Sequence, residues 1–261
     1  MDSIRRVDQL DTDDDGVKHR SDSITGLQST TNDGQVRSTD AIEPLPTISL
    51  SNNSKDFDVY RLYTSFVSAL RFDDKIGLTD YIVGFRELTK FFDQLGLVFV
   101  FVKNEVEEKL NVLQAHVNSG KKSHYDTVQK AVDYEIQNNL LTTTTSAGPS
   151  AARTLLRLHR AMNFIKLFLK CLADDPVSDS SATIAKRSYD KTLAAHHNYF
   201  VKLTVRAGFF SLPDRKKLDE IIFKGKKEEL NDQFHRFIDT LNKIYAIIDR
   251  LYEDKGLLNL P

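Results

Sequence analysis

Cysteine is nearly absent from this sequence: its 261 residues include one, Cys171. A single cysteine excludes a disulfide bond within the chain and is typical of proteins from a reducing compartment. Cys171 stands between Leu169 and Leu172 in an apolar helical pattern, where a thiol is more often a packing residue than a nucleophile. We therefore expect neither disulfide bonds nor thiol chemistry.

The sequence also lacks an excess of either charge and any long apolar run. Its 36 basic and 37 acidic residues give a net charge of -1, so no overall field attracts nucleic acid or an anionic membrane. Its apolar runs fall short of the about 20 residues that span a bilayer. The N-terminal MDSIRRVDQLDTDDDG has no apolar core of a secretory signal. These absences predict a soluble, cytoplasmic protein that does not bind nucleic acid.

Common catalytic and cofactor-binding motifs are missing as well. The chain has no GxGxxG, P-loop, HExxH, GxSxG or CxxC motif. The neighbouring histidines His196 and His197 are a poor metal motif, because adjacent helical positions diverge by about 100°. We expect neither a metal nor a cofactor.

Two regions differ in composition. In residues 1–55, single apolar residues are scattered among Asp, Ser, Thr and Asn, so the segment cannot bury enough surface to offset the entropy of ordering it. We interpret residues 1–55 as a disordered polar tail and residues 56–261 as one folded domain, a size usual for a single domain.

In the folded part, apolar residues recur at helical intervals, which predicts an all-α protein. The expected helices run from Val59 to about residue 73, Tyr81 to Leu113 with a bend near Gly84 or Gly96, Tyr125 to Leu140, Ala151 to Leu172, Thr183 to Arg206, from Pro213 onward, and Phe234 to Leu251. The apolar end GLLNLP is expected to pack onto the body or line a cavity.

The predicted helix from Tyr81 to Leu113 contains the apolar run LGLVFVFV and two charges close behind it. Glu105 and Lys109 share a helical face with Phe101 and Val102, so we expect them on the buried side. Burying charges costs several kcal/mol unless further partners are present. The alternative is an ordinary exposed i,i+4 ion pair, which contributes a few tenths of a kcal/mol.

The predicted helix from Ala151 places Arg153, Arg157 and Arg160 in a narrow arc that continues as Phe164 and Phe168. Guanidinium groups bind phosphate bidentately, and aromatic rings suit hydrocarbon, so this stripe indicates a site for an anionic amphiphile. The alternative is an exposed basic face whose side chains extend into solvent.

His197 shares a predicted helical face with apolar residues, where a histidine is more often a hydrogen-bonded core residue than a ligand. A general acid-base pair of His197 and Glu105 would lack both a nucleophile and a metal. We therefore expect that the protein is not an enzyme.

Several stretches together resemble the glycolipid transfer protein family, and within it the branch that transfers ceramide-1-phosphate. They are YIVGFRELTKFFDQLGLVFVFVKNEVEEKL, ARTLLRLHRAM, SYDKTLAAHHNYFVK with RAGFFSLPDR after it, and the terminal LLNLP. The resemblance spans roughly Phe57 to Pro261. It implies a two-layer α-helical sandwich, a monomer in transient contact with membrane surfaces, which transfers one sphingolipid with its chains in an apolar pocket.

The resemblance also implies roles for five residues. Glu105 would recognise the ceramide amide and His197 its carbonyl. Lys109, Arg153 and Arg157 would bind the phosphate. The family has aspartate where Glu105 stands, and a further arginine of this branch would fall near Thr144.

The chain has no tryptophan, whereas the family carries interfacial tryptophans at positions that are here Phe85, Phe164 and Tyr199. Together with Phe101, these residues are candidates for the apolar pocket or for membrane contact. The family stacks sugars on tryptophan, so its absence favours a phosphate headgroup. Glycosphingolipid transfer, and a lipid sensor or adaptor whose tail binds a protein, are the alternatives.

Overall fold

The structure is a computed structural model that describes residues 56–174 and 179–261. The predicted disordered tail, residues 1–55, lies outside the described residues. Within them the chain forms nine α-helices: α1 (Val59–Ala69), α2 (Leu78–Asp93), α3 (Leu97–Val117), α4 (Val128–Gln137), α5 (Ala151–Asp174), α6 (Ser181–Lys191), α7 (Tyr199–Gly208), α8 (Arg215–Phe223) and α9 (Lys227–Asp254). The prediction of an all-α protein is confirmed.

Short elements connect these helices. Four 3₁₀ turns lie at Phe72–Asp74, Lys122–Tyr125, Leu193–His196 and Phe209–Ser211. The connection between α4 and α5 contains a small antiparallel hairpin of β1 (Thr144–Thr145) and β2 (Gly148–Pro149).

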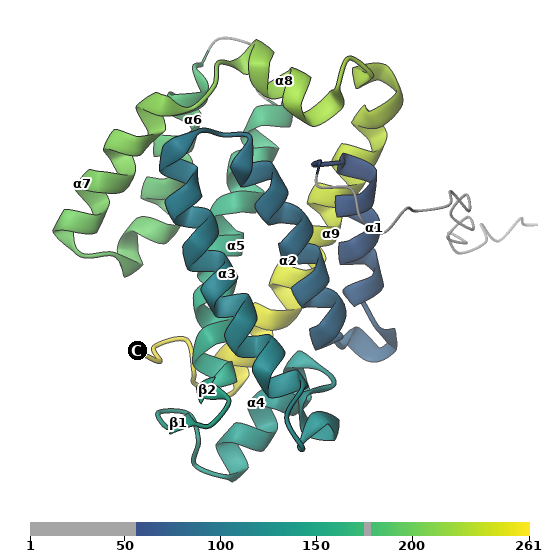
Figure 1. The fold of residues 1–261 in the computed structure, drawn as a ribbon, viewed down its shortest axis with the longest axis vertical. Helices are drawn as coiled ribbons and strands as arrows, with labels where there is room; N and C mark the ends of the chain where they lie inside the picture. Colours follow the sequence, from purple (N-terminus) through teal and green to yellow (C-terminus); the bar gives the residue numbers. More distant parts are fainter. Residues whose placement is uncertain (1–55, 175–178) are drawn as a thin grey trace, which may run out of the picture. The chain divides into compact units, whose positions relative to one another are not determined.

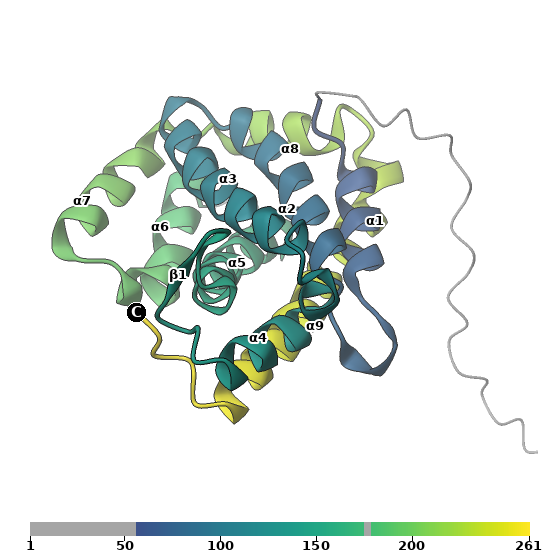
Figure 2. The ribbon, with the colours of Figure 1, turned by 60° about the horizontal axis from the view of Figure 1, so that its bottom comes forward.

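The helices form a two-layer sandwich, as the resemblance implies. Helices α1, α2 and α3 pack in succession, and they cover α5 and α9 (Figure 1). Helix α5 lies at the centre, between α3 on one side and α4, α6 and α9 on the others (Figure 2). The layers meet through aromatic side chains: the ring of Phe66 on α1 is 5.8 Å from that of Phe237 on α9, and within its own layer it is 5.6 Å from that of Phe85 on α2.

The prediction of one long helix from Tyr81 to Leu113 is wrong, because the chain reverses between α2 and α3. Gly96 has φ 99°, a conformation that glycine adopts readily and other residues rarely do. The two helices then pack against one another, and Lys103 on α3 binds the carboxylate of Asp93 at the end of α2 at 2.7 Å. The apolar run therefore begins a new helix.

The prediction of a continuous helix from Thr183 to Arg206 is also wrong. Helix α6 ends at Lys191, and Thr192 has a non-helical backbone with φ -129° and ψ -87°. A new helix, α7, begins after Asn198, whose side chain accepts a hydrogen bond from the backbone N–H of Val201 at 3.0 Å. His197 consequently lies in the connection and not on a helical face.

No helix within residues 56–174 and 179–261 has both the length and the apolar character needed to cross a membrane.

Candidate functional site

The start of α5, which carries the arginine stripe, is fixed by a buried carboxylate. Glu135 on α4 is 1% exposed. Its oxygens accept hydrogen bonds from the hydroxyl of Ser150 at 2.5 Å and from the backbone N–H groups of Ala151 at 2.8 Å and Ala152 at 3.0 Å. A negative charge at a helix N-terminus satisfies its free N–H groups and complements its dipole. Glu135 thereby holds the turn from which Arg153 projects.

Two arginines of the stripe bind the C-terminal segment. Arg153 Nε donates a hydrogen bond to the backbone oxygen of Pro261 at 3.1 Å. Arg160 Nη2 donates to the backbone carbonyls of Leu258 at 2.8 Å and Leu260 at 3.3 Å. The prediction that GLLNLP packs onto the body is thus confirmed.

Arg157 differs from its two neighbours because its side chain is exposed and has no hydrogen-bond or ion-pair partner among the described residues. Burial and the positive charge of Arg157 lower the pKa of Arg160 below its ordinary value. The stripe therefore concentrates positive charge. Within it, Arg157 is the arginine whose guanidinium group is available to bind an external anion.

The Glu105 and Lys109 pair lies on α3, but not on its buried side. Lys109 Nζ is 2.9 Å from Glu105 Oε2, and the side chains are 20% and 50% exposed, respectively. The buried apolar residues described on this helix form an adjacent face: Phe99, Val106, Leu110, Leu113 and Val117. The prediction of a buried pair is wrong, and the alternative of an i,i+4 pair at the surface describes it.

His197 is held by a residue that the sequence analysis missed. Its Nδ1 atom is 2.8 Å from the hydroxyl of Tyr189, a buried residue on α6. Partial burial, then the charges of His196 and Lys202, lower the pKa of His197. At neutral pH the imidazole is therefore uncharged, and Nε2 is its remaining polar atom. The position of Tyr189 on the apolar side of α6, after Ile184 and Ala185, was the available signal.

Aromatic rings connect His197 with α5. The ring of Phe164 lies 5.9 Å from that of Phe168, 6.2 Å from Tyr189 and 6.0 Å from Phe209. We call these four residues the aromatic cluster. The cluster joins α5, α6 and the 3₁₀ turn after α7. Tyr189 contacts both Phe164 and His197, so it links these two residues.

Of the remaining candidate residues, Phe85 lies in the core, and Phe101 and Tyr199 lie at the surface. Phe85 is fully buried in the core between α1 and α2, so it does not form part of a membrane-facing surface in this structure. Phe101 and Tyr199 are 67% and 72% exposed.

Tyr199 belongs to a larger apolar surface on and just after α7, which the sequence analysis did not identify. We call it the exposed apolar face; it consists of Tyr199, Phe200, Leu203 and Phe210. Phe200 is 76% and Phe210 85% exposed. The pattern YFVKL contained the signal, because aromatic residues in successive positions cannot all face inward from one helix.

The chain shares its sequence and fold with known lipid transfer proteins. The family model described as "Glycolipid transfer protein (GLTP)" matches residues 76–224. The ceramide-1-phosphate transfer protein of Rattus norvegicus is 32% identical over 212 residues, which cover 79% of this chain and 98% of the rat protein.

Solved structures of ceramide-1-phosphate transfer proteins have a similar fold. The mouse ceramide-1-phosphate transfer protein without ligand has a TM-score of 0.74 at 31% identity, covering 79% of this chain and 100% of the mouse chain. The human protein in complex with 12:0 ceramide-1-phosphate has a TM-score of 0.73 at 29% identity, covering 78% and 100%. The chain therefore belongs to the glycolipid transfer protein family.

Proposed function

We propose that this protein is a non-enzymatic carrier that moves a phosphosphingolipid, ceramide-1-phosphate, between membranes. The observation that carries the proposal is Arg157, an exposed cation without a partner among the described residues, on a helix whose next turns contribute Phe164 and Phe168 to the aromatic cluster. An anionic headgroup and attached hydrocarbon match that order of residues. The likeness to ceramide-1-phosphate transfer proteins supports the same ligand.

The headgroup would be bound by residues from three parts of the fold. Arg157 on α5 would bind the phosphate together with Arg153, which would exchange its hydrogen bond to Pro261 for one to the phosphate, and with Lys109 on α3, a helix that packs against α5. Glu105 would accept a hydrogen bond from the ceramide amide N–H. The uncharged His197 would donate from Nε2 to the amide carbonyl, with Tyr189 fixing the ring through Nδ1.

The hydrocarbon chains would enter the interior between the two layers. A closed apolar pocket there is lined by side chains from both layers, among them Leu88 on α2, Leu169 on α5 and Phe237 on α9; its cavity volume is about 0 Å³, so an entering chain would push these side chains apart. We call it the inner pocket. It is lined only by apolar side chains, so a chain that enters it leaves no buried polar group without a partner.

The exposed apolar face would bring this site to a membrane. Large apolar side chains that cluster on a protein surface mark interaction sites, and aromatic rings suit the interface between headgroups and hydrocarbon. A monomer in transient contact with cytoplasmic membrane surfaces fits this face and the single cysteine, Cys171.

Transfer between vesicles tests the proposal. Donor vesicles that contain fluorescent ceramide-1-phosphate are mixed with acceptor vesicles, and the transfer rate is measured for the wild type and Arg157→Leu. We expect a loss of about tenfold or more in the variant, because hydrogen bonds to charged groups contribute about 1.5–3 kcal/mol. Arg250→Leu, which removes an exposed arginine from α9, serves as the matched control.

Two outcomes would contradict the proposal. Equal transfer by Arg157→Leu would remove the phosphate site from this helix, and preferred transfer of fluorescent galactosylceramide would favour a sugar headgroup. Mass spectrometry of the lipid after long incubation checks the non-enzymatic part, since a carrier returns its ligand chemically unchanged.

A further inference from the structure

The C-terminal segment, residues 257–261, is an ordered element with apolar anchors. Gly256 has φ 67°, and the N–H of the next residue donates a hydrogen bond back to the last turn of α9 at 2.8 Å, an arrangement that ends a helix. Leu257 is buried, and the half-buried side chains of Leu258 and Leu260 pack against the core. The segment is therefore held against the body by its side chains as well as by its backbone.

The hydrogen bonds between this segment and the arginine stripe differ at its two ends. The half-buried Arg160 donates two, to the carbonyls of Leu258 at 2.8 Å and Leu260 at 3.3 Å. Arg153 donates one, to the backbone oxygen of Pro261 at 3.1 Å, and this contact is exposed. The bond at Arg153 is thus the one that a ligand from solvent can replace most easily.

The C-terminal segment lies on the side of α5 where the headgroup would bind. Arg153 and Arg160 are seven positions apart on α5, about 10 Å along the helix axis, and Arg157 lies between them. Figure 1 and Figure 2 both show the end of the chain beside the connection between α6 and α7, which contains His197. Partial burial, and then the charge of Arg160, lower the pKa of His196 in the same connection. The segment therefore occupies the region between the stripe and His197.

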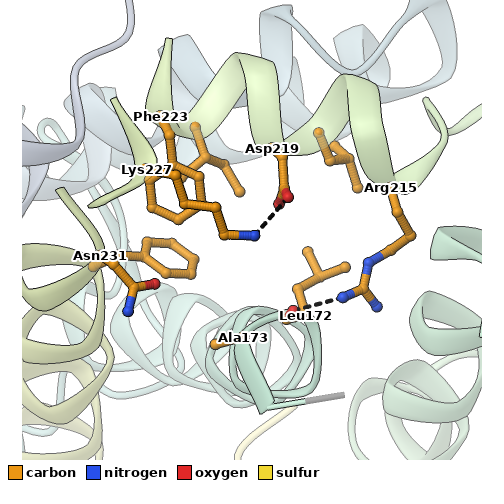
Figure 3. A pocket seen from close by; sticks show the side chains of 10 residues that line it. Leu172, Ala173, Arg215, Asp219, Phe223, Lys227 and Asn231 are labelled. Carbon is orange, nitrogen blue, oxygen red and sulfur yellow. Dashed lines mark hydrogen bonds and ion pairs between the residues drawn. The ribbon is translucent and has the colours of Figure 1, made fainter. Parts of the chain in front are cut away.

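The contacts of the stripe orient its guanidinium groups without balancing their charge. No side-chain carboxylate within residues 56–174 and 179–261 pairs with these three arginines. A different arrangement surrounds Arg215 near the end of α5: it also donates to a peptide carbonyl, that of Leu172 at 2.8 Å, but a carboxylate, Asp219, lies in the same cluster and pairs with Lys227 at 2.6 Å (Figure 3). Because charge-assisted hydrogen bonds are the stronger ones, an anion is a better ligand for the stripe than a peptide carbonyl.

We propose that the C-terminal segment is a built-in competitor of the phosphate headgroup. Its end leaves Arg153 when a phosphate binds there and returns when the lipid departs, while the bonds to Arg160 keep the segment attached. This inference rests on the proposed function and assigns a regulation to the same site.

Such competition has two physical consequences for a carrier. In the absence of lipid, the segment holds the guanidinium groups in place, which reduces the entropy lost when a phosphate binds. It also lowers the apparent affinity by the fraction of molecules in which its end is released. If that fraction is about one in ten, the affinity is about tenfold lower, which favours delivery of the lipid to a second membrane.

The first test loosens the segment and leaves every arginine in place. Leu258→Ser together with Leu260→Ser removes apolar anchors, and Asn259→Ser, at an exposed position of the same segment, is the matched control. Binding of ceramide-1-phosphate with an acetyl chain is measured by calorimetry. We expect the double variant to bind about tenfold more tightly than the wild type, and the control to bind like the wild type.

The outcomes separate this inference from the proposed function. Equal or weaker binding by the double variant, folded as judged by circular dichroism, would overturn the competitor, since a purely structural segment would support the site. Failure of the wild type to bind ceramide-1-phosphate would instead overturn the proposed function, and this inference with it.

A second measurement follows the segment itself and does not depend on the double variant. The chain has no tryptophan, so Asn259→Trp introduces a single fluorophore into the segment, and Ala246→Trp, at an exposed position of α9, is the control. We expect acetyl ceramide-1-phosphate to lower the fluorescence anisotropy of Asn259→Trp only, and acetyl ceramide, which lacks the phosphate, to leave it unchanged. Constant anisotropy with bound ceramide-1-phosphate, or an equal decrease with ceramide, would contradict the proposal.

Discussion

Glu105 is the proposed site residue whose surroundings differ most from those that the sequence predicts. Its carboxylate is half exposed and paired with Lys109, so it is not buried without a partner. An exposed ion pair contributes little to stability. In the proposed function, Glu105 therefore contributes acceptor oxygens beside a cation, so that the amide and the phosphate of one lipid would be bound together.

Glu105→Gln tests this role. The substitution keeps the size of the side chain but replaces the charged acceptor, so we expect transfer of ceramide-1-phosphate to fall about tenfold or more. The free energy of unfolding should change by less than about 1 kcal/mol, because the broken pair is exposed. Glu108→Gln, an exposed glutamate on the same helix, is the control. If both variants transferred lipid equally well, Glu105 would have no place in the headgroup site.

Some of these positions could be predicted and others could not. The spacing of Arg153, Arg157 and Arg160 places them on one side of any α-helix, and the structure has them there. The buried face of α3 could not be predicted in the same way, because LVFVFV places apolar residues on every side of a helix. Packing against α2 and α5 selects Phe99, two positions before Phe101, and Val106, one position after Glu105, for the interior.

Two helix starts that follow a proline were predicted well, whereas the break at Gly96 between α2 and α3 was not. Pro213 and Asp214 precede α8, and Gly148 and Pro149 precede α5, as the sequence indicates. The break between α6 and α7 falls in LAAHHN, which contains neither glycine nor proline. Tertiary packing imposes this break, since Tyr189 and His197 form their hydrogen bond across it. Because the helix is broken between Tyr189 and His197, helical spacing could not predict that they contact one another.

Helix α7 presents the exposed apolar face, and its proposed contact with membranes can be tested separately from lipid binding. Phe200→Ser with Leu203→Ser removes two large apolar groups that are 76% and 58% exposed. Full burial of such a side chain contributes about 1.5–3 kcal/mol, so binding to phosphatidylcholine vesicles should weaken by about tenfold or more. Flotation with vesicles measures this, and transfer should slow in parallel.

Phe72→Ser is the matched control for that pair. Phe72 is 96% exposed in the turn between α1 and α2, outside the exposed apolar face. We expect this variant to bind vesicles like the wild type. Equal weakening by Phe72→Ser would mean that general surface apolarity, and not α7, determines membrane contact.

The molecule as a whole contains several histidines that favour the neutral form. Burial lowers the pKa of His159, His196 and His197, and the charge of Arg160 acts in the same direction on His159 and His196. His159 is 2% exposed on α5. Its Nε2 atom is 2.9 Å from Asp249 of α9, which raises its pKa, and its ring stacks on Tyr245 at 4.2 Å. Lys166 lowers its pKa further, and burial is the largest effect.

These shifts predict that the folded protein loses stability on acidification. A histidine in the unfolded chain binds its proton near pH 6.5, whereas these folded histidines bind theirs at lower pH. Between the two pKa values the unfolded chain holds more protons, so the free energy of unfolding rises with pH. The contribution of these histidines reaches its full value above about pH 6.5. Urea unfolding at pH of about 7.5, 6.5 and 5.5 measures it. We expect His159→Gln to flatten the decrease and His235→Gln, at a partly exposed position on α9, to change it less. Stability that stayed constant down to pH of about 5.5 would contradict the lowered pKa values.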